Sequence, residues 1–179
     1  MDREPRVIKA LGVSPGIAIG KAFVLERGHI PLPHYTLSGD QAVAEECQRF
    51  EEAVAKTARD LEAIKGRITP DRREHSHVLE VHQMILRDPQ FFDQTLAIIR
   101  ERKLNAQWAL VRTLMKTHEL FKSLPDEYVQ GRVADVDAVG ERVLRHLAGE
   151  GTDWAKGPRE RVILVAHDLS PADILEITI

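Results

Sequence analysis

Histidine offers the clearest chemistry in this sequence, because His75, His77 and His82 lie close together in the segment HSHVLEVH. Residues seven apart share a face of a helix, so His75 and His82 lie on one face and His77 is displaced. Glu74 or Glu80 would be needed to complete a zinc site. The segment lacks the His-Glu-x-x-His spacing of zinc enzymes. Solvated or interface histidines are therefore the favoured interpretation, and a metal site is the alternative.

The other potentially reactive side chains are not surrounded by the residues that a catalytic site would need. His167 and Asp168 follow an apolar segment, and strand ends are where α/β proteins place functional groups. However, the sequence has no phosphate-binding glycine loop, and neither a nucleophile nor a paired carboxylate lies near His167. Cys47 falls on an apolar helix face and is interpreted as core. Two acidic pairs are assigned to the solvent side of the same helix: Glu45-Glu46 and Glu51-Glu52.

Composition excludes several classes of protein. A net charge of −3 over 179 residues provides no basic surface for nucleic acid. The single cysteine rules out an internal disulfide and is typical of a reducing compartment. No apolar run approaches the roughly 20 residues of a membrane-spanning helix, and the first residues, MDREPRVIKA, lack a secretory pattern. We therefore expect a cytoplasmic protein that binds neither membrane nor nucleic acid.

One long helix is predicted after the linker at 31–33. Ser38 is its expected N-cap, with Gln41 completing a capping box. Apolar residues then follow at alternating spacings of four and three, which predicts a helix with one narrow buried seam that ends at Thr69-Pro70. The seam consists of Val43, Cys47, Phe50, Val54, Thr57, Leu61, Ile64 and Ile68.

Further helices are predicted over 72–86, 91–103, 106–120 and 126–147. Asp88-Pro89 separates the first of these helices from the second. Asn105 is the expected N-cap of the third, and Ala148-Gly149 ends the last. Short connections between helices favour an antiparallel bundle. The last helix has a seam of Val129, Val133, Val136, Gly140, Val143 and Leu147.

The two ends of the chain have a different pattern. Residues 7–11 and 17–25 are expected to form strands around Pro15-Gly16, and 161–166 a buried strand followed by a helix with Ser170 as N-cap and Pro171 at its first position. We therefore expect a mainly α protein, with an antiparallel helical bundle over 37–150 inserted in an incomplete α/β unit made of 1–36 and 151–179. A strand and one helical turn are an unusual end, so we interpret the sequence as truncated.

An apolar cluster surrounds the Asp88-Pro89 break. Met84, Ile85, Phe91 and Phe92 flank it, and Phe121 lies near the next turn. An exposed apolar cluster rimmed by charge is typical of a protein-docking site. A hydrophobic plug beneath the break is an equally weighted interpretation.

Four segments in order give the chain a resemblance to a known family. They are LGVSPGIAIGKAFVL, EVHQMILRDPQF, DEYVQGRVADVDAVGERVLR and VILVAHDLSPADIL, and together they resemble the N-terminal region of Enzyme I, the phosphoenolpyruvate–protein phosphotransferase of the bacterial phosphotransferase system. The resemblance covers essentially the whole chain. It implies a discontinuous α/β phosphohistidine swivel domain interrupted by the helical bundle.

The resemblance also implies an activity for the whole protein. In this family, phosphate passes from phosphoenolpyruvate to a histidine of the swivel domain and then to the carrier HPr, for sugar uptake. A C-terminal barrel with Mg²⁺ binds phosphoenolpyruvate, and the full-length enzyme is expected to be a homodimer through that barrel. None of the histidines here, His167 included, matches the Gly-Gly-x-Thr-Ser-His acceptor segment, which is expected beyond Ile179. This chain alone is therefore expected to be inactive and without a cofactor.

Docking of HPr or a paralogue is the role that the resemblance assigns to this chain. The family's carrier-binding surface lies on the kinked second helix and the start of the last helix. The chain departs from a well-known acidic pattern after the kink, where it has Arg87, Pro89 and Gln90. The matching positions are Met84, Ile85, Phe91, Phe121 and Val129, which would receive an apolar patch, and Arg132, which would add a polar or ionic contact.

Three alternatives remain open at this point. A nitrogen-regulatory Enzyme I paralogue would share these segments and often carries an upstream sensory domain. A pyruvate phosphate dikinase or phosphoenolpyruvate synthase has a similar SPGIAIGKA segment but no helical insertion as long as 38–147. A non-catalytic helical scaffold, binding metal through His75 and His82, is the third.

Overall fold

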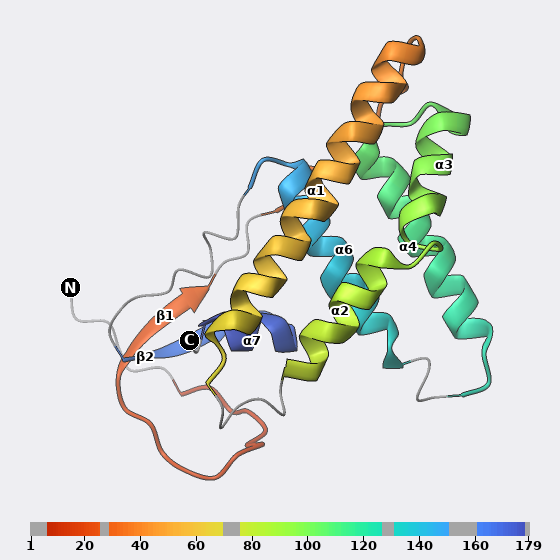
Figure 1. Ribbon diagram of the computed structural model, residues 1–179. Helices are drawn as coiled ribbons and strands as arrows, with labels where there is room; N and C mark the ends of the chain where they lie inside the picture. The colour runs from red at the N-terminus through yellow and green to blue at the C-terminus, as the bar shows by residue number, and fades with distance from the viewer. Residues whose placement is uncertain (1–6, 26–28, 70–75, 127–130, 151–160, 178–179) are drawn as a thin grey trace.

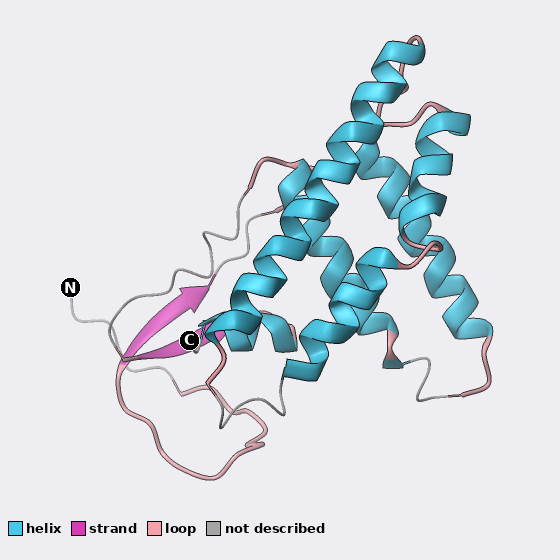
Figure 2. Cartoon of the chain, viewed as in Figure 1, coloured by secondary structure: helices cyan, strands magenta, loops and turns pink. Residues whose placement is uncertain are grey.

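The computed structural model describes residues 7–25, 29–69, 76–126, 131–150 and 161–177. Helices pack into a bundle, and a small two-stranded sheet lies beside one end of it (Figures 1 and 2). This confirms the mainly α fold class. No helix within the described ranges is both long and apolar enough to cross a membrane. In chain order the elements are β1 (Lys21–Leu25), α1 (Asp40–Arg67), α2 (His77–Arg87), α3 (Phe92–Arg102), α4 (Ala106–Ser123), α6 (Val133–Leu147), β2 (Val162–Ala166) and α7 (Pro171–Ile177).

The long helix α1 is formed as the apolar spacing predicts. Phe50, Leu61 and Thr57 on its seam are fully buried, and Cys47 is 7% exposed. The Thr57 hydroxyl donates a hydrogen bond to the Ala53 carbonyl at 2.9 Å, so the one polar seam residue is satisfied within its own helix. The seam prediction is confirmed.

The predicted capping box at the start of α1 is wrong. The helix begins at Asp40, its N-cap is Gly39 at φ 87°, and no side chain donates or accepts a capping hydrogen bond there. A positive φ is accessible to glycine without a steric penalty, so Gly39 sets the entry angle in place of Ser38. Asp40 in the first turn supplies negative charge to the helix N-terminus.

The break between α2 and α3 confirms the effect of Asp88-Pro89. Asp88 has an extended backbone, at φ −69° and ψ 127°, which ends α2. Its carbonyl then accepts hydrogen bonds from the backbone N–H groups of Phe91 and Phe92, at 3.0 and 2.8 Å. The chain thus turns sharply and restarts as α3 within a few residues.

Close packing of α6 on α4 depends on one glycine. A Cβ atom at Gly140 would lie 2.6 Å from Cδ1 of Leu114, inside any normal contact distance. Val136, Val143 and Leu147 of the predicted seam are buried. Val129 lies outside the described residues.

The sheet joins the two ends of the chain, as expected. β1 pairs with β2 in parallel, from Lys21 opposite Val162 to Leu25 opposite Ala166. The predicted strand at 7–11 is wrong, because those residues have no regular structure and no pairing strand, and Ile17 and Ile19 are 95% and 97% exposed. A strand is stabilised by its ladder of partners, so β propensity alone does not form one there.

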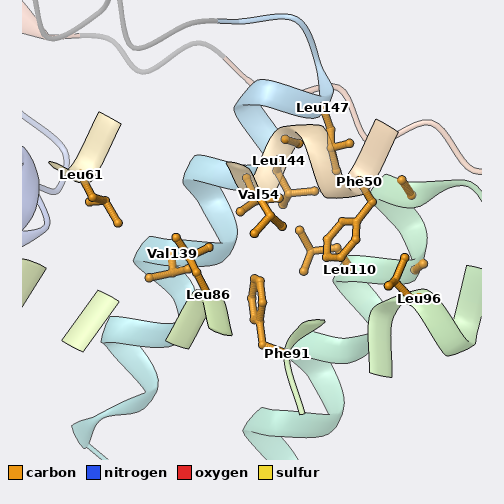
Figure 3. Packing of buried hydrophobic residues seen from close by; sticks show 14 of the residues in the cluster. Phe50, Val54, Leu61, Leu86, Phe91, Leu96, Leu110, Val139, Leu144 and Leu147 are labelled. Carbon is orange, nitrogen blue, oxygen red and sulfur yellow. The ribbon is translucent and has the colours of Figure 1, made fainter. Parts of the chain in front are cut away.

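The core of the bundle draws on α1, α2, α3, α4 and α6. Figure 3 shows Phe50, Leu110 and Phe91 converging between these helices. Phe50 also pairs with Phe92 at a ring-centroid distance of 5.7 Å. Ala172 and Leu175 of α7 belong to the same cluster, so this short C-terminal helix is packed with the bundle.

Candidate docking surface

A mainly apolar hollow lies beside the α2–α3 break. Its volume is about 260 Å³, and it opens between the end of α2, the start of α3, the second half of α4 and the start of α6. We call this the docking hollow. It is lined by Ile85, Asp88, Gln90, Phe91, Gln94, Thr113, Lys116, Thr117, Leu120, Phe121 and Val136.

Three of the residues predicted to bind a partner line this hollow together. Ile85 is half-buried, Phe121 is partly exposed, and Phe91 is only 3% exposed. Phe91 therefore forms the floor of the hollow and is also the predicted plug beneath the break. Phe92 packs against Phe50 and does not line the hollow.

The other predicted residues lie away from the hollow or outside the described part. Met84 is 70% exposed on α2 but does not line the hollow. Arg132 is also exposed, and its guanidinium donates to the Asp135 carboxylate at 3.1 Å on the same helix end. Val129 falls outside the described residues.

Most of the α4 side of the hollow was missed in the sequence, where Phe121 was the one α4 residue predicted. Thr113, Thr117 and Leu120 recur at helical spacing on one face, and Leu120 is 55% exposed. Lys116 donates a hydrogen bond to Gln94 at 3.2 Å and so ties α4 to α3 at the rim. Because threonine and lysine interrupt the apolar pattern, this face has no strong hydrophobic signal. The spacing alone could have found it.

The histidines of the segment HSHVLEVH have different environments in the structure. His82 is fully buried between helices, with its Nε2 3.6 Å from Asp135 of α6. Neither ring nitrogen forms a hydrogen bond within the described part of the chain. Burial lowers the pKa of His82, and the Asp135 carboxylate offsets this only in part. A solvated role for His82 is therefore wrong.

His77 lies on a different face, exposed, and pairs with Glu80 at 3.3 Å. Hydrogen bonds from Lys65, at 3.0 Å, and from His77 lower the pKa of Glu80. His75 lies outside the described residues. No group of three potential metal ligands occurs among the described residues.

One carboxylate assigned to the solvent face is in fact buried. Glu46 is 7% exposed and accepts hydrogen bonds from Arg49 at 2.8 Å, from Tyr35 at 3.2 Å and from the backbone N–H of Ala106 at 2.6 Å. The negative charge of Glu46 thus stabilises the N-terminus of α4, where the helix dipole is positive. Its bond to Tyr35 also holds the segment that precedes α1. Glu45, Glu51 and Glu52 are exposed as predicted.

A second hollow lies at the ends of the two parallel strands. Its volume is about 820 Å³, and it is lined by residues of β1 and β2 together with His167, Asp168 and Glu141 of α6. His167 is exposed.

Comparison with known proteins decides the family. Residues 9–132 match the family described as PEP-utilising enzyme, N-terminal. The chain belongs to this family. Among curated PEP-utilising relatives, it is 35% identical to a phosphoenolpyruvate-protein phosphotransferase of Cupriavidus necator, over 96% of the chain and 31% of the relative. It is 32% identical to the Bacillus subtilis protein of the same name, over 95% of the chain and 30% of the relative.

Solved structures of the PEP-utilising family agree with the fold. An NMR structure of an Enzyme I N-terminal protein superposes with a TM-score of 0.77 at 28% identity, covering 92% of this chain and 66% of that one. An N-terminal domain of a nitrogen-type Enzyme I superposes with a TM-score of 0.61, also at 28% identity, covering 90% and 66%. The resemblance to Enzyme I is thus confirmed. The chain spans about a third of the length of the curated relatives that it matches.

Proposed function

We propose that this chain is the carrier-docking N-terminal part of a phosphoenolpyruvate–protein phosphotransferase, and that the phosphocarrier HPr docks on the docking hollow. The whole enzyme passes phosphate from phosphoenolpyruvate through a phosphohistidine to HPr, in the cytoplasm, for sugar uptake. The observation that supports docking is the hollow itself, with the aromatic floor of Phe91, the exposed rim of Leu120 and the neighbouring exposed Met84.

The chemistry of the hollow suits a partner with an apolar patch. Its lining combines Ile85, Phe121 and Val136 with only one acidic and one basic group, Asp88 and Lys116. Interface energy concentrates where an apolar side chain fills a pocket and excludes water. Gln90 and Lys116 at the rim offer donors that orient the partner without a strong net charge.

No phosphoryl step is assigned to a residue of this chain. The sequence has no Gly-Gly-x-Thr-Ser-His segment. Mg²⁺ and phosphoenolpyruvate are proposed to bind the C-terminal barrel of the whole enzyme. The proposed contribution of the chain is to hold the carrier close to the histidine that phosphorylates it, which raises the local concentration of the second reactant.

Calorimetric titration of the chain with HPr tests the proposal. Leu120→Ala and Phe121→Ala should each weaken binding by about five- to thirty-fold, because truncating a central interface residue costs about 1–2 kcal/mol. Leu32→Ala is the matched control, since Leu32 is also an exposed leucine, at 41%. Leu32 directly precedes the segment that is hydrogen-bonded to Asn105 at the start of α4. Asn105 lies about 22 Å from Leu120 along the axis of α4.

Equal effects of the three variants, or no binding of HPr by the wild-type chain, would contradict docking at this hollow. The same titration with the nitrogen-type paralogue of HPr separates the two branches. Tighter binding of that paralogue would assign the chain to the nitrogen-regulatory alternative.

A further inference from the structure

Helix α7 belongs to the C-terminal segment yet packs with the bundle. It contacts α1 and α2 near the end of α1 (Figure 1). Ala172 is fully buried and Leu175 is 7% exposed, both within the main hydrophobic cluster. In the sheet, by contrast, Leu25 is the single buried residue of the two strands. The described α/β segment is therefore attached to the bundle mainly through α7.

A buried arginine faces α7 from the bundle. Arg142 of α6 is 5% exposed, and its Nη2 donates to the Asp173 carboxylate at 2.7 Å and to the Glu176 carboxylate at 3.0 Å. The side chains of Asp173 and Glu176 are 4% and 11% exposed. Arg142, Asp173 and Glu176 are called the Arg142 clasp. Nε and Nη1 of Arg142 form no hydrogen bond within the described residues, so its described partners both come from α7.

Asp173 also connects this clasp to the turn that follows β2. Its second carboxylate oxygen accepts hydrogen bonds from the backbone N–H and the hydroxyl of Ser170, and the Ser170 hydroxyl in turn accepts from the Asp173 N–H at 3.3 Å. This is a reciprocal N-terminal cap. One carboxylate thus holds Arg142 with one oxygen and the start of α7 with the other.

We propose that Arg142 is a positioning residue that fixes α7, and with it strand β2, at a set place on the bundle. Val136 of the docking hollow lies on the same helix, about 9 Å along its axis from Arg142. The consequence rests on the proposed function: the clasp then stabilises the arrangement in which α6 connects the carrier-docking surface to the segment that carries β2 and α7.

Burial makes the clasp sensitive to the loss of either partner. Removing one side of a buried ion pair leaves an uncompensated charge, which costs far more than an exposed pair does. Burial already raises the pKa of Glu176, and Arg142 offsets that only in part. Loss of the guanidinium therefore leaves two buried carboxylates and favours release of α7 into water.

Amide hydrogen exchange of the full chain tests the proposal. In Arg142→Met, exchange in α7 and β2 should accelerate at least about tenfold, while α2–α4 amides keep their wild-type rates. Glu46→Gln is the control, because it too breaks an ion pair between an arginine and a buried carboxylate, and the printed partners of Glu46 lie outside α7. If Arg142→Met does not fold, Glu176→Gln, which leaves the Ser170 cap intact, should show the same local acceleration.

The orientation of the two strands relative to the bundle provides a second measurement. It would not change if Arg142 only contributed stability. Residual dipolar couplings of 21–25 and 162–166 should fit the alignment of the bundle in the wild type and depart from it in the clasp variants. Unchanged α7 exchange, or acceleration spread equally over the bundle as in Glu46→Gln, would overturn the proposal. HPr titration of the wild type, run in parallel, reports separately on the proposed function: absent binding refutes docking and leaves the exchange result to decide the clasp.

Discussion

Acidification should destabilise the bundle through His82. The imidazole is fully buried, and its pKa is lowered by that burial. A histidine with a lowered native pKa binds its proton more weakly when folded than when unfolded. Stability is therefore complete above the unfolded pKa of about 6.5 and falls as the pH drops below that value. At pH 5.5, preferential protonation of the unfolded chain costs up to about 1.4 kcal/mol.

Urea unfolding at pH 7.5 and pH 5.5 measures this loss. His118 and His146 also lie beside carboxylates, those of Asp137 and Asp60, and both proteins in the comparison keep these pairs. A His82→Leu variant isolates the contribution of His82, because only the difference in pH dependence between the two proteins is compared. The wild type should lose about 1 kcal/mol more than the variant on acidification. Parallel losses in the two proteins would refute the burial of an uncharged imidazole at this position.

Two further perturbations test the packing of the bundle by urea unfolding. Gly140→Val should lower the free energy of unfolding by about 1–3 kcal/mol, because the added side chain meets Leu114. Gly66→Ala is the control and should not lower it, because Gly66 lies at an open helix position. Phe50→Ala should lower it by about 3–5 kcal/mol, since Phe50 is fully buried and pairs with Phe92. A loss below about 1 kcal/mol in Phe50→Ala would contradict its central place in the core.

The long helix was predictable because its pattern is redundant. Buried positions repeat along α1 at spacings of three and four, so no single exception, such as the polar Thr57, obscures the face. The α2–α3 break was equally predictable, since proline at position 89 removes a backbone donor. The pairing of the two distant ends followed from the apolar composition of 21–25 and 162–166.

Two of the three failures depend on contacts, made or missing, between distant residues. Glu46 looks like a surface carboxylate beside Glu45, and only the approach of Tyr35 and the start of α4 explains its burial. Ser38 is a good N-cap by type, but the chain direction set by Gly39 leaves it unused. Residues 7–11 have strand propensity without a partner strand. Local sequence shows neither the burial of Glu46 nor the missing partner of 7–11, whereas Gly39 stands directly beside Ser38.

The hollow beside the α2–α3 break was foreseen only in part from the sequence. Ile85, Phe91 and Phe121 carry an apolar signal around a visible helix break, so they were found. The α4 face of Thr113, Thr117 and Leu120 is polar in part, so only its helical spacing marks it in the sequence.

An NMR titration of the isotope-labelled chain with unlabelled HPr is the most direct test of docking at the hollow. We predict saturable shifts of amides at 85–94 and 113–121, with Leu120 and Phe121 among them and with residues 40–47 unmoved. Saturable shifts confined to another face, or no shifts at millimolar HPr, would contradict docking at the hollow beside the α2–α3 break.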